Sequence, residues 1–195
     1  MIAYVRGLLS SKTPARAVVE AAGVGYEFLI PLTTYDRLPR VGEEVKLLAC
    51  HVVREDDESL FGFATENERD MFVKLTGVSG VGPKIALSIL SGSSTGELSM
   101  AIASGDAKRI SAIRGVGRKT AEKICIELKD KVDIFAAHAD SPGGGIPPAA
   151  RDAVAALRSL GFGDEPSSKM VADVISRNPG MNDVEKIIKA ALAGK

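Results

Sequence analysis

The chain has 195 residues, of which 45% are hydrophobic and 26% charged, and its formal net charge at neutral pH is zero. This composition is typical of packed domains and excludes a disordered chain. No apolar run approaches the roughly 20 residues that span a bilayer, and the first residues lack the basic-then-apolar order of a signal peptide. We therefore expect a cytoplasmic protein with one large domain or two to three small ones.

Residues 1–63 have the alternating pattern of β-strands. Five short strands at this spacing suit a small closed or partly open barrel, and the oligonucleotide-binding (OB) type is the natural candidate. The pattern predicts strands over residues 2–9, 15–21, 26–32, 45–53 and 59–63, with turns at 23–25 and 41–42.

An acidic segment, Arg54-Glu55-Asp56-Asp57-Glu58, separates the last two strands. Taken alone, it favours an ordinary solvated hairpin tip, in which aspartate is common. The alternative is a wedge that repels DNA strands and keeps them apart. A nuclease metal site is disfavoured, because neighbouring strand residues point to opposite faces and no separate acidic cluster would complete the cage.

From Glu66 onward the pattern becomes helical, with predicted helices over residues 67–75, 83–91, 95–104, 107–113 and 118–132. This part contains one short pattern twice, 35 residues apart. The first copy reads Leu75, Val78, Gly80-Val81-Gly82, Lys84 and Ala86, and the second reads Ile110, Ile113, Gly115-Val116-Gly117, Lys119 and Ala121. Each copy predicts a helix, a tight turn and a second helix.

Glycines in such a turn permit a positive φ and the close approach of another backbone. Free N–H groups at the start of the second helix would donate hydrogen bonds to a phosphate, and Lys84, Arg118 or Lys119 adds positive charge. Such contacts position a duplex without reading its sequence. The alternative is a structural αα-hairpin whose glycines only end one helix and begin the next, but the duplication favours nucleic-acid binding.

The charge is distributed unevenly. Residues 71–131 contain ten basic residues (Lys and Arg) and five acidic residues (Asp and Glu), a net charge of +5. Residues 43–70 contain three basic and nine acidic residues, a net charge of −6. We expect one surface that attracts phosphate and another that repels it.

Residues 136–148 are rich in Pro and Gly and predict a flexible linker. Three short amphipathic helices follow, over about 150–160, 166–177 and 182–192. Their apolar positions are more numerous than so small a bundle easily buries. We expect some of them to face a partner, with Leu157, Leu160 and Phe162 as the candidates.

Cys50 and Cys125 lie far apart among apolar neighbours, which favours buried free thiols over a disulfide. His51 and His138 are the only histidines. Without a Cys/His cluster we expect neither a metal site nor a cofactor.

The motifs along the whole chain resemble, in their order, those of the RuvA family of Holliday-junction-binding subunits. Single helix-hairpin-helix turns occur in many DNA-binding proteins, but this ordered set is highly specific. The matching segments are Met1-Ile2, Gly23–Glu27, Val52–Asp56, Leu60–Phe63, Gly80–Lys84, Ala86–Gly92 and Gly115–Lys123.

The resemblance implies an α+β multidomain chain with a five- or six-stranded OB-type barrel (1–63), a domain with two helix-hairpin-helix motifs (64–135), a linker (136–148) and a three-helix UBA-like domain that binds the RuvB ATPase (149–195). It implies non-catalytic, sequence-independent binding of four-way junctions in recombination, DNA repair and the SOS response to DNA damage. It also implies a homotetramer, or an octamer on DNA, and RuvC resolvase in the junction complex.

The resemblance also assigns roles to individual residues. Glu55 and Asp56 fall at the positions of an acidic pin at the junction crossover. The positions that would bind the DNA backbone are Gly80, Gly82, Lys84, Gly115, Gly117, Arg118, Lys119 and Thr120.

The sequence also bears on three rival functions. An ATPase loop is contradicted by Pro83, which stands where the phosphate-binding lysine of Gly77–Gly82 would belong. A base-flipping glycosylase needs aromatic side chains around its pocket, and the chain has 5% aromatic residues and no Trp. A pure protein scaffold remains open and predicts no preference for junction DNA.

Overall fold

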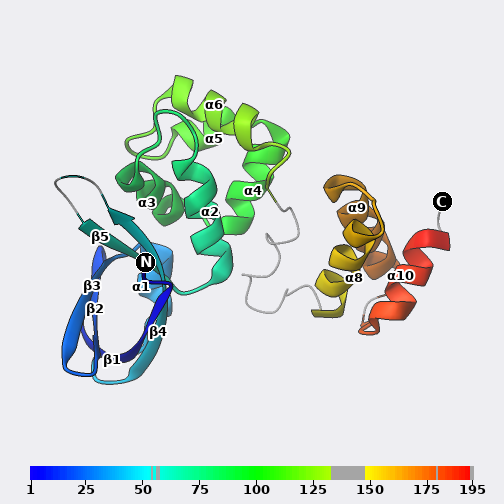
Figure 1. Ribbon diagram of the computed structural model, residues 1–195. Coiled ribbons are helices and arrows are strands. Elements are labelled where there is room, and N and C mark those ends of the chain that lie inside the picture. The colour runs from blue at the N-terminus through cyan, green and yellow to red at the C-terminus, as the bar shows by residue number, and fades with distance from the viewer. Residues whose placement is uncertain (54, 56–57, 133–147, 179, 194–195) are drawn as a thin grey trace. The chain divides into compact units, whose positions relative to one another are not determined.

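The computed structural model describes residues 1–53, 55, 58–132, 148–178 and 180–193. The chain divides into two compact units, Met1–Val132 and Asp133–Lys195. The first unit combines a β-barrel with a group of helices, and the second is a helical bundle (Figure 1). Of the predicted linker 136–148, residues 136–147 lie outside the described residues.

The barrel is a closed sheet, which confirms the predicted OB-type fold. Around it the strands follow the order β1-β2-β3-β5-β4, and they pair in antiparallel fashion except for the parallel pair β3–β5. The strands are β1 (Tyr4–Thr13), β2 (Arg16–Ala21), β3 (Val24–Leu29), β4 (Glu44–Val53) and β5 (Glu58–Phe63).

The structure differs from the predictions on both sides of β3. The preceding turn consists of Ala22 and Gly23, which both have positive φ values of 52° and 79°, so Val24 and the residue after it belong to the strand and not to the turn. After β3, Pro31 precedes the unpredicted helix α1 (Leu32–Arg37). Six residues are too few to produce a helical period in a sequence.

The predicted helices of the first unit are all present, although α5 and α6 end earlier than predicted. Strong apolar periodicity and capping residues such as Thr65 and Ser94 define them. They are α2 (Glu66–Thr76), α3 (Pro83–Gly92), α4 (Thr95–Ser104), α5 (Ala107–Ser111) and α6 (Arg118–Leu128).

Strand β5 connects the barrel with the helices. Phe61 and Phe63 belong to the same hydrophobic core as α2, α3, α4 and α6. The ring centroid of Phe72 lies 5.0 Å from each of these two rings. Burial of each side chain contributes about 2–3 kcal/mol, so this core holds the helices against one side of the barrel.

A buried polar network reinforces this connection. The Glu68 side chain at the start of α2 is 1% exposed. Its Oε2 accepts hydrogen bonds from the Thr34 hydroxyl of α1 at 2.8 Å and from the Ala64 N–H at 3.0 Å. Glu68 also forms a capping box with Thr65. One carboxylate therefore joins α1, the end of β5 and α2.

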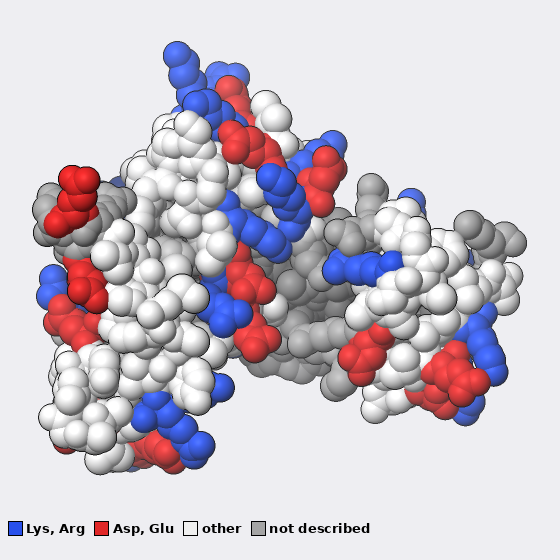
Figure 2. Space-filling model, in the orientation of Figure 1, with Lys and Arg blue, Asp and Glu red and all other residues white. Residues whose placement is uncertain are grey.

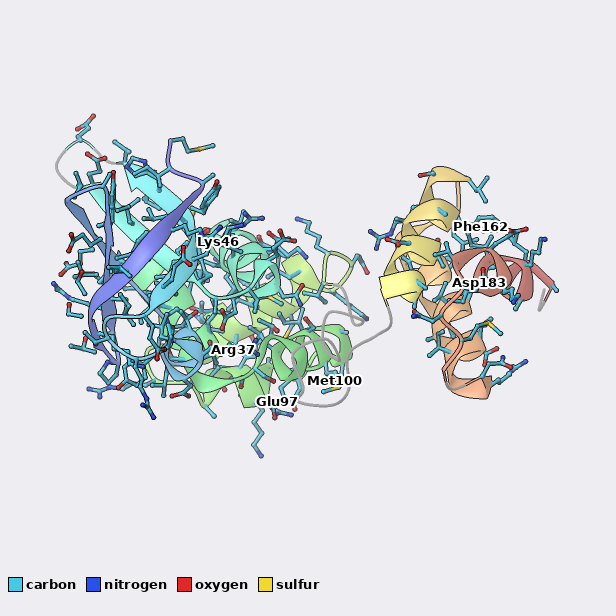
Figure 3. All side chains as sticks on the ribbon, turned by 90° about the horizontal axis from the view of Figure 1, so that it is seen from below. Arg37, Lys46, Glu97, Met100, Phe162 and Asp183 are labelled. Carbon is cyan, nitrogen blue, oxygen red and sulfur yellow. The ribbon has the colours of Figure 1, made fainter. Side chains whose placement is uncertain are left out.

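We expect Glu68→Ala to lower the free energy of unfolding by about 3 kcal/mol, because buried donors lose their acceptor. Glu97 is the matched control: it forms a capping box with Ser94 on α4, but it is exposed (Figure 3). The Ser94 N–H lowers the pKa of Glu97. Glu97→Ala should cost about 1 kcal/mol. Denaturant titrations measure both variants. An equal decrease in the free energy of unfolding would contradict the role of Glu68 in joining α1, β5 and α2.

The second unit is a three-helix bundle within the described residues, as predicted. Its core includes Ala153, Leu157, Val171 and Ile187. The helices are α8 (Pro148–Ser159), α9 (Asp164–Arg177) and α10 (Val184–Ala193).

Candidate nucleic-acid interface

The two copies of the repeated pattern form turns with the same backbone geometry. Gly80 and Gly115 have φ values of 91° and 90°. Gly82 has φ −81° and ψ 168°, and Gly117 has φ −76° and ψ 158°. The sequence repeat is therefore a structural repeat.

The internal hydrogen bonds of the turns repeat as well. The Val81 N–H donates to the Val78 carbonyl at 3.0 Å, and the Val116 N–H donates to the Ile113 carbonyl at 3.1 Å. Both central valines are buried, so they anchor the turns in the core. The preceding helices have already ended, with Gly77 as the residue after α2, so neither glycine pair is needed to end a helix.

The glycines of each pair have different roles. Gly80 and Gly115 need a positive φ, which other residues rarely adopt. The Gly-Val-Gly pattern predicts a positive φ for Gly117 as well, but this prediction is wrong because its φ of −76° is in the ordinary range. Apart from the two adjoining residues, no atom of the described chain lies within 4 Å of a Cβ atom built at Gly82 or Gly117. Internal packing therefore gives no reason for glycine there, whereas the close approach of an outside group would.

Both turns lead into helices that have no side-chain cap. Gly82 and Gly117 are the N-cap residues of α3 and α6, and neither supplies a capping hydrogen bond. Among the described residues, the first N–H groups of α3 and α6 with a hydrogen-bond acceptor are those of Ala86 and Ala121, which donate to the Gly82 and Gly117 carbonyls at 3.0 and 2.9 Å. Side chains cap α2, α4 and α5 instead. The starts of α3 and α6 thus keep N–H groups available for an anion.

Positive side chains surround these helix starts. Lys84 and Lys119 are exposed, and within the described part of the chain no ion pair involves either ammonium group. Arg118 Nε lies 2.9 Å from Glu122 Oε1, but both side chains are exposed. Such pairs contribute about 0–1 kcal/mol, so Arg118 can exchange its partner for a phosphate. Thr120 is half-buried.

Lys and Arg side chains gather over the helical part of the first unit, with carboxylates among them (Figure 2). Acidic side chains lie on the side of the β4–β5 hairpin. This distribution agrees with the charge separation along the sequence.

The acidic hairpin is described in part. Glu55 is exposed, whereas Arg54, Asp56 and Asp57 lie outside the described residues. At the base of the hairpin, His51 Nε2 lies 2.7 Å from Glu58 Oε1. Sequence reasoning missed this contact, because it depends on the register that places Val53 opposite Glu58. The described residues contain no group of three or more His, Cys, Asp or Glu side chains that could hold a metal ion.

The candidate partner-binding residues of the second unit differ in exposure. Leu157 is fully buried in the core of the bundle, and Phe162 is half-buried against that core (Figure 3). Leu160 is 63% exposed. Of these three residues, Leu160 has the side chain that is most accessible to a partner.

A third turn with the same geometry joins α8 and α9. Gly161 has a φ of 92°, and Gly163 has φ −63° and ψ 162°. The residues that follow are Asp164 and Glu165, where the other turns carry Lys or Arg. Backbone geometry alone therefore does not define a phosphate site, because the adjacent charges decide which ion is attracted.

The two cysteines are free thiols, and burial raises the pKa of both Cys50 and Cys125. Raised thiol pKa values disfavour the reactive thiolate. In the part of the chain that the structure describes, no helix combines the length and apolar character needed to cross a membrane.

Comparisons with known proteins cover all three parts of the chain. Residues 1–62 match the RuvA N-terminal domain, residues 72–130 match a SAM-like helix-hairpin-helix tandem, and residues 148–194 match the RuvA C-terminal domain. The chain is 42% identical to the Holliday junction branch migration complex subunit RuvA of Salinibacter ruber, covering 98% of both chains. It is 40% identical to the same subunit of Chlorobaculum tepidum, covering 98% of this chain and 96% of that one. It is 39% identical to the same subunit of Pseudomonas fluorescens, covering 100% of this chain and 99% of that one. The chain belongs to the RuvA family.

Proposed function

We propose that this chain binds four-way junction DNA as the non-catalytic subunit of a branch-migration complex. The observation that carries this proposal is the pair of turns with equal geometry, each leading into an uncapped helix with a nearby lysine. The relatives' name, Holliday junction branch migration complex subunit, supports the choice of ligand. In this role the subunit holds the junction open during recombination and repair.

The turns bind the sugar-phosphate backbone and not the bases. N–H groups at a helix start, an adjacent cation and a glycine without a side chain recognise phosphate, which is the same at every base pair. Two such turns contact two phosphates at once. Binding is therefore independent of sequence, and the preference for a junction comes from the arrangement of its four arms.

The preference for a junction also needs more than one copy of the chain. A four-way junction has four equivalent arms, and a cyclic homotetramer would present one pair of turns to each of them. A second tetramer on the opposite face would give an octamer. In this assembly the acidic hairpins lie at the crossover and repel the strands that enter it, which keeps them separated.

ATP hydrolysis belongs to the partner in this proposal. The first turn, within Gly77–Gly82, continues into Pro83, the first residue of α3, and this proline stands where a P-loop has its phosphate-binding lysine. The RuvB ATPase would supply the motor and bind the second unit through an apolar surface that includes Leu160. RuvC resolvase would join through the junction, and a complex that acts on chromosomal DNA would work in the cytoplasm.

The function is tested first at Lys119. We expect Lys119→Ala to weaken binding equally for junctions with different arm sequences. The slope of log affinity against log salt should fall by about 0.9, which corresponds to one lost phosphate contact. Fluorescence anisotropy over a range of salt concentrations measures both quantities. An unchanged affinity and slope in the folded variant would exclude Lys119 from the interface.

A second test concerns the acidic hairpin. Reversing Glu55 and Asp56 to Lys should preserve or tighten junction binding, because attraction replaces repulsion. The preference for a junction over a duplex and the control of strand separation should decrease. The matched control reverses Glu20 and Glu27, exposed carboxylates of β2 and β3, with the same change in net charge. If both double variants lose the preference for a junction to the same extent, the position of the reversed charges does not matter. The hairpin would then be an ordinary solvated turn.

A further inference from the structure

The two turns have the same backbone geometry but different chemistry. Where the first turn has Ser79 directly before its positive-φ glycine, the second has Arg114. Where the first helix begins with Pro83, the second begins with Arg118. Proline has no N–H to donate, so the second helix start offers one more donor as well as more positive charge.

The backbone at Arg114 is fixed by contacts from the first motif. The Ser88 hydroxyl on α3 donates a hydrogen bond to the Arg114 carbonyl at 2.8 Å. The neighbouring Ile113 packs closely against Gly92 on α3, because a Cβ atom added at Gly92 would lie 3.2 Å from the isoleucine side chain. Helix α3 therefore holds the segment that leads into the second turn, and with it the position from which the Arg114 side chain extends.

The Arg114 side chain itself is not engaged. It is exposed, and within the described residues no hydrogen bond or ion pair involves its guanidinium. Other arginines of the helical part do have partners: Arg118 pairs with Glu122 at 2.9 Å, and Arg109 pairs with Glu97 at 2.8 Å. Arg114 thus combines a fixed backbone with a free guanidinium, directly beside the turn.

We propose that Arg114 binds a DNA phosphate together with the second turn, and that this turn consequently holds the backbone more strongly than the first. The guanidinium suits this role because its planar set of donors matches two phosphate oxygens. Ser88 is then a positioning residue. The inference rests on the proposed junction binding, but it adds a contact that the repeated pattern does not contain.

The test exchanges the residues at the two equivalent positions. Arg114→Ser should weaken junction binding roughly three- to tenfold and lower the salt slope by about 0.9. Ser79→Arg places a guanidinium at the exposed matching position of the first turn and should raise the affinity and the slope by similar amounts. Arg109→Ser is the control for net charge, because that guanidinium is already paired, and it should change binding by less than about twofold.

The outcomes separate this inference from the proposed function. If Lys119→Ala weakens binding while Arg114→Ser matches the Arg109→Ser control, the turn binds DNA without Arg114 and the inference is overturned. A Ser79→Arg variant with unchanged affinity and slope would contradict the claim that this position reaches a phosphate. If neither Lys119→Ala nor Arg114→Ser changes binding, the proposed interface fails as a whole. Thermal unfolding of each variant verifies its fold.

Discussion

Gly117→Asp is expected to abolish measurable junction binding while leaving the protein as stable as the wild type or slightly more stable. Gly117 is the N-cap of α6 in an extended conformation with open space around its Cα. Aspartate is a favoured N-cap residue and interacts well with the helix dipole, by about 0.3–1 kcal/mol. The same carboxylate would occupy the phosphate position and repel the DNA.

Two comparisons make this result specific. Gly163→Asp introduces the same residue at the N-cap of α9, where the backbone conformation is nearly the same, and it should leave junction binding unchanged. Gly115→Ala changes the positive-φ glycine and should lower stability by about 1 kcal/mol or more. Junction titration and thermal unfolding measure the two effects. A folded Gly117→Asp variant with wild-type affinity would remove the second turn from the interface.

The second large effect is expected from a chain that ends at Val132. This fragment corresponds to the first compact unit, which has its own hydrophobic cores, so junction binding should persist nearly unchanged. ATP-driven branch migration with added RuvB should be abolished, because the unit that we propose to bind the motor is missing. Migration by the fragment at the full-length rate would contradict this division of labour.

Point variants refine the same prediction. Leu160→Asp places a charge on an exposed leucine and should reduce migration without unfolding the bundle. Leu157→Ala removes a fully buried side chain and should destabilise the second unit by about 2–5 kcal/mol. If Leu160→Asp supports migration as well as the wild type does, the motor binds elsewhere on the second unit.

Local patterns were sufficient for most of the fold. Alternation in residues 1–63 and helical periodicity afterwards predicted the barrel strands and the helices, because each element buries a regular face. Helix α1 escaped prediction because it is short and begins after Pro31. The turn before β3 was placed too late, because a Gly-Val-Gly sequence does not reveal which residue takes the positive φ.

The candidate site was predicted as a set of positions but not in its details. The repeat identified both glycine pairs, yet only the structure distinguishes Gly115, which has a positive φ, from Gly117, which has an ordinary extended conformation. The contacts of Glu68 with Thr34 and of Ser88 with Arg114 join residues 34 and 26 positions apart. Such contacts depend on tertiary packing, which no local pattern encodes.

The central claim is that the chain recognises the shape of a four-way junction through its phosphate backbone. It is tested most directly by the affinities of the full-length protein for a junction and for a duplex built from the same arms, measured at one salt concentration with two unrelated arm sequences. We expect the junction to bind at least about tenfold more tightly, equivalent to ~1.4 kcal/mol, and both arm sequences to agree within about twofold. Equal affinities for junction and duplex, or a strong dependence on arm sequence, would contradict the claim.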